Sequence, residues 1–150
     1  SDLVRSYQLY LIKDEIAGHY FGKERLLYQL FKDHSKATGE MEEIISQQIK
    51  YLTKTIPSLQ VHQLLLQHLS KHNGFRAEHG VYYLRENKTH SAAVLKFLNK
   101  RKLLLESTGS LEAETIFFEV LRKIESTFLA VDLHSNVCGW LKPIKERKFV

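Results

Sequence analysis

The sequence is poor in several residue types whose abundance defines protein classes. It contains one cysteine, Cys138, two prolines and seven glycines in 150 residues. A single cysteine excludes an internal disulfide, a cysteine-based zinc site and a CxxC redox motif. So little proline and glycine excludes collagen-like and Pro/Gly-rich disordered chains. No apolar run approaches the roughly 18 residues that span a bilayer, and residues 1–8 do not resemble a signal peptide. We therefore expect a soluble cytoplasmic protein.

The overall composition is that of an ordinary globular domain. Hydrophobic residues make up 43% of the chain and charged residues 26%. The absence of repeats, linkers and low-complexity segments predicts a single domain over residues 1–150. Lysine and arginine number 22 against 17 acidic residues, which gives a formal net charge of +5. This charge is compatible with binding to nucleic acid or to an acidic protein, and it does not favour one over the other.

Hydrophobic periodicity predicts an α+β fold. Helical spacing predicts helices at 15–34 (one unit interrupted at Gly22), at 40–53, from Ser58 to a stop near Asn73-Gly74, and at 111–124. Alternating patterns predict strands at 7–12, 81–85, 92–98, 102–106, 127–133 and 137–141. Asp14 and Ser58 are the expected N-caps, and residues 107–110 an expected turn. The order β-α-α-α-β-β-β-α-β-β, with its clustered strands, predicts a mixed or mostly antiparallel sheet packed against helices.

Candidate metal-binding and nucleophilic residues are few. His68 and His72 have i, i+4 spacing but lack the glutamate of an HExxH zinc motif, so two exposed histidines near a helix end are the preferred interpretation. Cys138 and His134 would offer a nucleophile and a base, but no cysteine-enzyme signature surrounds them. A lone strand cysteine is more often a small buried hydrophobe. No phosphate-binding glycine loop occurs, and we expect no cofactor, no metal and no enzymatic activity.

Charged residues gather in three places along the sequence. Glu112, Glu114 and Glu119 could pair for acid/base chemistry, but Glu112 and Glu114 are two residues apart on a helix and so point to different sides. The preference of a first helical turn for acidic residues is the favoured explanation. The basic clusters are a turn (Lys96, Lys100, Arg101, Lys102) and the tail (Lys142, Lys145, Arg147, Lys148). A solvated turn and tail are the default interpretation. Direct DNA binding through both is the alternative function.

Aromatic and aliphatic residues at helical spacing indicate a second kind of surface. Ile16 and Tyr20 share a face of the first short helix because they are four residues apart. Gln48, Tyr51 and Leu52 form a patch along one edge of the 40–53 helix by the same rule. Tyrosines at the rim of an amphipathic face are typical of protein–protein hot spots. The alternative is that these rings only flank the core.

Four strings carry a resemblance to a known family. They read YLIKDE at 10–15, AGHYFG at 17–22, EAETIFFEVLRK at 112–123 and GWLKPIKERKFV at 139–150. Together they resemble the SirA family, the sporulation inhibitors of replication of endospore-forming bacteria. The resemblance spans nearly the whole chain and is strongest in the last 40 residues.

The resemblance implies a non-enzymatic inhibitor that binds the N-terminal domain I of the replication initiator DnaA and so blocks new rounds of replication. It also implies which residues make the contact. Tyr20 matches within HYFG, and Gln48, Ile49 and Tyr51 match within QIKY. Leu52 stands where a similar aliphatic residue is expected. Ile16 stands where the family has an aromatic residue, so this position keeps its apolar character but loses ring stacking.

Overall fold

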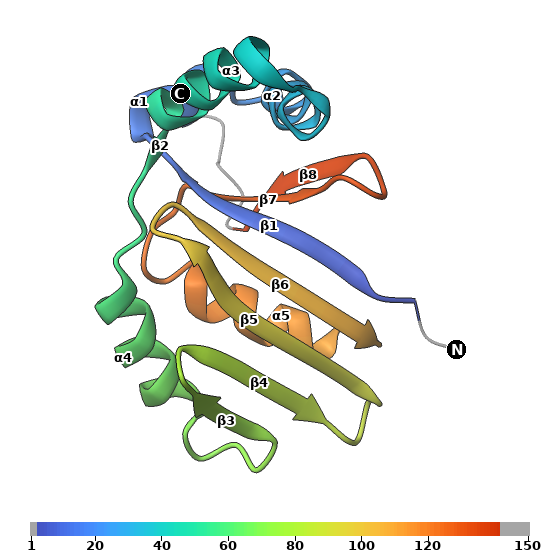
Figure 1. Cartoon of the computed structure of the whole chain (residues 1–150). Helices are drawn as coiled ribbons and strands as arrows, with labels where there is room; N and C mark the ends of the chain where they lie inside the picture. The colour runs from blue at the N-terminus through green and yellow to red at the C-terminus, as the bar shows by residue number, and fades with distance from the viewer. Residues whose placement is uncertain (1–2, 142–150) are drawn as a thin grey trace, which may run out of the picture.

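The computed structural model describes residues 3–141, which form five helices and eight strands (Figure 1). The helices are α1 (Asp14–His19), α2 (Glu24–Lys36), α3 (Gly39–Leu52), α4 (Ser58–Leu69) and α5 (Glu112–Leu121). The strands are β1 (Arg5–Ile12), β2 (Thr53–Lys54), β3 (Phe75–Glu78), β4 (Val81–Glu86), β5 (Ser91–Asn99), β6 (Lys102–Gly109), β7 (Phe128–Asp132) and β8 (Val137–Trp140).

The eight strands belong to one sheet. Its order is β3-β4-β5-β6-β1-β7-β8, and β2 pairs with β1 off this path. Every strand pair in the described part of the chain is antiparallel. The predicted α+β class with a mostly antiparallel sheet is therefore confirmed.

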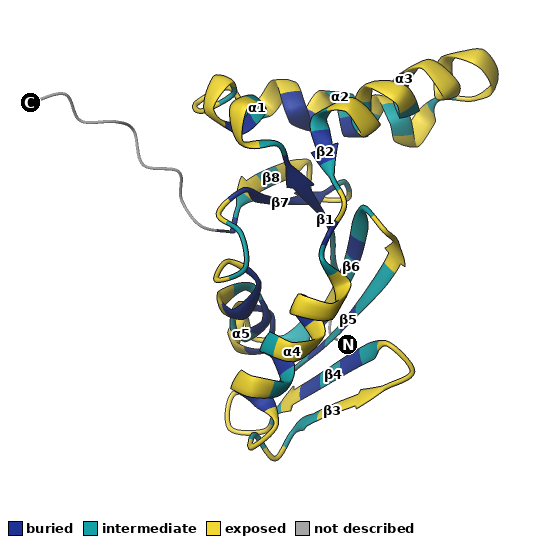
Figure 2. Ribbon diagram, turned by 90° about the vertical axis from the view of Figure 1, so that its left-hand side faces the viewer, coloured by how far each residue is buried: buried dark blue, intermediate teal, exposed yellow. Residues whose placement is uncertain are grey.

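Strands β1 and β7 carry hydrophobic cores on both faces, because successive side chains of a strand point to opposite sides. Leu9 and Leu11 pack into the larger cluster, which includes buried residues of α4 and α5. Tyr10 and Ile12 pack into a second cluster with α1 and α2. Figure 2 shows the consequence: α4 and α5 lie on one side of the sheet, while α1–α3 form a separate layer at one end, with largely exposed outer surfaces.

The predicted turn at residues 107–110 is wrong in part, because β6 continues to Gly109. Ser107 pairs with Arg5 of β1 and with Ala93 of β5, so this segment has a partner on each side. Gly109 has a φ of +76°, and a Cβ there would lie 1.8 Å from the carbonyl oxygen of His90. Only glycine allows the two strands to approach so closely at this position.

Two short strands and two helix starts differ from the predictions. Strand β2 has two residues and β3 has four, which is too short for an alternating pattern to be recognised in the sequence. Helices α1 and α4 begin at Asp14 and Ser58 themselves, and neither start has a side-chain capping hydrogen bond. The Asp14 carboxylate instead lies 3.6 Å from the ammonium group of Lys54.

A buried carboxylate joins α5 to the sheet. The Glu114 side chain accepts hydrogen bonds from Arg5 Nε at 2.5 Å, Tyr7 Oη at 2.6 Å and Ser107 Oγ at 2.7 Å. Glu114 is only 4% exposed. Burial, and then the hydrogen bond to Glu114, raise the pKa of Tyr7 well above its ordinary value, so its hydroxyl stays protonated and donates. Glu114 therefore has a structural role, joining α5 to β1 and β6, that its interpretation as a helix-dipole residue did not include.

Candidate functional site

The position of α3 is fixed by its C-terminal end. Leu52 accepts a hydrogen bond at 2.9 Å from the backbone N–H of Lys13, which leads into α1. The next residue, Thr53, pairs with Ile12 of β1, and its carbonyl accepts a hydrogen bond at 2.8 Å from Arg101. These bonds hold the last turn of α3 against the central strand and beside α1.

The other end of the helical layer is tied to the β7–β8 hairpin through α2. The Tyr28 hydroxyl donates to Asn136 Oδ1 and Arg25 Nη1 donates to the Asn136 carbonyl, both at 2.8 Å. Asn136 has a φ of +56°, which asparagine tolerates better than most residues. The orientations of α2 and α3 are thus both set by contacts with the sheet.

Between these helices lies a cavity of about 480 Å³ that we call the helical groove. Its lining combines apolar side chains with two amides, and comprises Tyr20, Leu26, Leu27, Leu30, Gln47, Gln48, Tyr51 and Leu52. Leu26 is 61% exposed and Tyr51 is 67% exposed. Large apolar side chains so exposed along a concave surface mark a site that can bury further area against a partner.

The groove brings together four of the six residues expected at the contact surface. Tyr20 comes from the end of α1, and Gln48, Tyr51 and Leu52 come from the last turns of α3. Sequence spacing predicted which of these residues share a face of one helix. The meeting of the two helices at one cavity depends on the contacts of β1 and β2.

Ile16 and Ile49 lie differently. Both are half-buried and pack against the second hydrophobic cluster, as Tyr20 and Leu52 also do, but neither is among the residues that line the groove. Ile49 lines a different cavity, on the other side of α3. Their side chains can support the groove from beneath, and neither lines it.

Leu26, Leu27 and Leu30 of α2 and Gln47 of α3 are the groove residues that the sequence did not predict as contact residues. The three leucines have the spacing of one apolar helix face within the predicted 15–34 helix, and such a face is more often part of the core. In the structure, Leu27 is buried whereas Leu26 is mainly exposed. The sequence signal that could have indicated this surface is an apolar face on α2 that is too wide for a single partner helix to cover.

A cation shapes the rim of the groove. The Lys13 ammonium lies 4.6 Å from the centroid of the Tyr51 ring, within the range of a cation–π contact. The rings of His19 and Tyr20 meet edge to face with centroids 5.1 Å apart. Both tyrosines therefore have a neighbour that restricts their orientation before any partner arrives.

The other candidate residues lie apart from the groove. His72 follows α4 and lies 3.2 Å from Glu86, whereas His68 is exposed in the last turn of that helix. The part of the chain that the structure describes contains no group of three or more His, Cys, Asp or Glu residues able to hold a metal. In the same residues, no helix is long and apolar enough to cross a membrane.

Cys138 is half-buried, and its thiol lies 3.5 Å from the carbonyl oxygen of Glu24. Burial raises the pKa of this thiol, so little of it is thiolate near neutral pH. We expect iodoacetamide to alkylate Cys138 more slowly in the folded protein than in the urea-unfolded protein at the same pH. Mass spectrometry over a time course measures both rates. A faster rate in the folded state would indicate an activated cysteine and contradict this structure.

The basic turn between β5 and β6 is only partly free to bind DNA. Arg101 Nη1 donates to the Thr53 carbonyl at 2.8 Å, so its guanidinium is held against the α3–β2 junction. Lys100 is exposed and Lys102 is half-buried. The basic tail at 142–150, which the DNA-binding alternative also needs, lies outside the described residues.

The fold and the groove define a small α+β domain that presents an exposed apolar cavity between two helices. Comparison with known proteins places this domain in a family. The family model described as "Sporulation inhibitor of replication protein SirA" matches residues 5–145. The Sporulation inhibitor of replication protein SirA of Bacillus subtilis (strain 168) is 42% identical over 149 residues, which cover 97% of this chain and 99% of that protein. The chain belongs to the SirA family.

Proposed function

We propose that this protein is a non-enzymatic, cytoplasmic, single-domain inhibitor of chromosome replication during sporulation, and that it acts by binding domain I of DnaA at the helical groove. The family described as sporulation inhibitors of replication supports the biological role. The observation that carries the binding site is the meeting of Tyr20, Gln48 and Tyr51 around one exposed apolar cavity.

The groove has the physical features of a recognition site. Tyr20 and Tyr51 offer large, rigid surfaces that bury much area for little loss of conformational entropy. Gln48 is exposed beside them and can fix the orientation of the partner through hydrogen bonds. Lys13 adds a positive charge at the rim, which favours association with an acidic surface and makes the rate sensitive to salt.

Leu26 provides a test that depends on the structure rather than on the family resemblance. Leu26→Ala is expected to weaken binding to purified DnaA domain I by about 1–2 kcal/mol, since the complex would no longer bury most of this side chain. Because Leu26 is 61% exposed in the free protein, the free energy of unfolding should change little. Calorimetric titration measures the first quantity and urea unfolding the second.

Leu59 on α4 is the matched control, because it is a leucine with a similar exposure, 68%, on a different helix and outside the groove. Leu59→Ala should bind DnaA domain I as the wild type does. Equal affinities for Leu26→Ala, Leu59→Ala and the wild type would show that α2 takes no part in the interface.

A further inference from the structure

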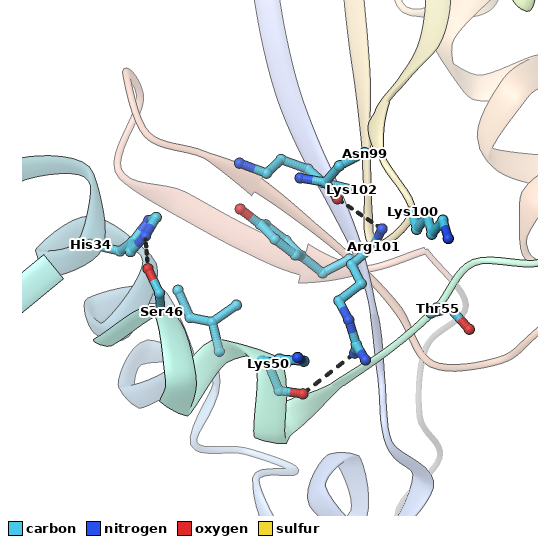
Figure 3. A pocket seen from close by; sticks show the side chains of 10 residues that line it. His34, Ser46, Lys50, Thr55, Asn99, Lys100, Arg101 and Lys102 are labelled. Atoms are coloured by element: carbon cyan, nitrogen blue, oxygen red, sulfur yellow. Dashed lines mark hydrogen bonds between the residues drawn. The ribbon is translucent and has the colours of Figure 1, made fainter. Parts of the chain in front are cut away.

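A second cavity lies on the opposite side of α3 from the helical groove. It has a volume of about 540 Å³, within the range of about 300–1,000 Å³ typical of small-molecule sites. Figure 3 shows it between the side chains of α2 and α3 and the β5–β6 turn. One part of its wall is formed by His34 and Ser46, which are hydrogen-bonded at 2.8 Å. We call it the basic cavity.

The charged side chains of the basic cavity all have the same sign. Its lining includes Lys50 of α3 and Lys100, Arg101 and Lys102 of the β5–β6 turn, and no carboxylate lies among the described residues that line it. Lys54, by contrast, lies outside this cavity and has two carboxylates near its ammonium group, Asp14 at 3.6 Å and Glu125 at 3.5 Å. Positive charge concentrated on concave walls of low dielectric attracts anions more strongly than the same charge on a flat surface.

The two best-placed cations are held by different elements. Lys102 opens β6, and its ammonium lies 5.7 Å from the centroid of the buried Tyr10 ring. Burial lowers the pKa of Lys102, which means that its charged form is incompletely solvated and would gain from an anionic partner. Lys50 projects from α3 and is exposed. Lys100 extends outward at the rim (Figure 3).

Arg101 is both a structural and a potential binding group. Its Nη1 is occupied by the carbonyls of Thr53, at 2.8 Å, and Lys50, at 3.4 Å. Within residues 3–141, the hydrogen bonds of the guanidinium all use Nη1, which leaves Nε and Nη2 to donate. A guanidinium that is already fixed in place loses little entropy when it binds an oxyanion.

We propose that the basic cavity binds a small phosphorylated ligand with two or more phosphate groups, which Lys50 and Lys102 contact from α3 and β6 while Arg101 donates between them. A cavity of about 540 Å³ has room for more than one phosphate group, and its cations come from two separate elements that could each contact one. Phosphate oxygens are the acceptors that lysine and arginine bind with charge-assisted hydrogen bonds. The residues involved differ from those of the helical groove, so this site does not depend on DnaA binding.

Calorimetric titration of the full chain with three probes tests this inference: inorganic tripolyphosphate, ATP and adenosine. We expect tripolyphosphate and ATP to bind and adenosine not to bind. Lys102→Met, which keeps the aliphatic stem, and Lys50→Gln should each raise the Kd about tenfold through loss of a charge-assisted hydrogen bond. Lys123→Ala, an exposed lysine just beyond α5, is the matched control and should leave the Kd within about twofold of wild type.

A second readout comes from the titration of Lys102 itself, followed by NMR of its side-chain amine. Bound phosphate should raise the Lys102 pKa, because a neighbouring anion favours the ammonium form. The proposal would be overturned by adenosine binding as tightly as ATP, or by an equal loss of affinity in Lys123→Ala. It would also be overturned if neither tripolyphosphate nor ATP binds at millimolar concentration, including the case in which a DNA duplex does bind.

Discussion

Tyr51→Ala and Tyr20→Ala are each expected to weaken binding to DnaA domain I by about 2–4 kcal/mol, as for interface hot spots. Tyr51 is 67% exposed in the free protein, so a partner that fills the groove would bury most of its ring. Lys13 already holds that ring at 4.6 Å, which reduces the entropy lost on binding. Calorimetric titration gives the change in affinity, and circular dichroism checks that each variant is folded.

Tyr83 supplies the matched tyrosine for these variants. It lies on β4, away from the helical layer, and its ring also packs against a cation, with Arg76 at 4.2 Å. Tyr83→Ala should therefore retain wild-type affinity for DnaA domain I. If Tyr20→Ala and Tyr51→Ala bind no more weakly than Tyr83→Ala, the groove is not the binding surface.

Glu114→Ala is expected to lower the free energy of unfolding by about 2–4 kcal/mol. The substitution removes three short hydrogen bonds and leaves Arg5, Tyr7 and Ser107 without their shared acceptor. Leaving a buried donor unpaired costs about 1–3 kcal/mol of stability. The Arg5 side chain is 27% exposed, so water can partly replace its lost acceptor, which reduces the summed cost. Urea unfolding followed by circular dichroism measures the change.

Glu112 is the control for this effect. It lies in the same first turn of α5 and is exposed, so Glu112→Ala should cost less than about 1 kcal/mol through the helix dipole alone. Similar losses for the two variants would mean that helix polarity, rather than the buried hydrogen bonds, explains why acids occur here.

The contrast between Glu112 and Glu114 shows which features of the core could be predicted from the sequence and which could not. The α+β class and the main elements were predictable because their apolar residues repeat at periods of 3.6 and 2. Glu114 was assigned to the helix dipole because its partners, Arg5, Tyr7 and Ser107, lie on other strands. Strand β2 could not be predicted, since its two residues pair only after α3 has been placed against β1.

The candidate site was predictable to a similar extent. Spacing placed Gln48, Tyr51 and Leu52 on one edge of a helix, and the groove does include all three. Spacing could not reveal that Leu26 lies across from them, because the neighbouring positions of α2 and α3 depend on contacts with the sheet. It also could not separate Ile49, which packs inward, from its exposed neighbours Gln48 and Tyr51.

The most direct test of the proposed interface is an NMR titration of the ¹⁵N-labelled protein with unlabelled DnaA domain I. Binding at the helical groove predicts that the largest shifts fall on the backbone amides of the groove, in α1, in the first half of α2 and in the last turns of α3. The β3–β4 hairpin should be unaffected, because it lies at one edge of the sheet, separated by β5 and β6 from strand β1, against which the helical layer packs. Shifts concentrated on the β5–β6 turn or the β3–β4 hairpin, with the groove unchanged, would contradict the proposal.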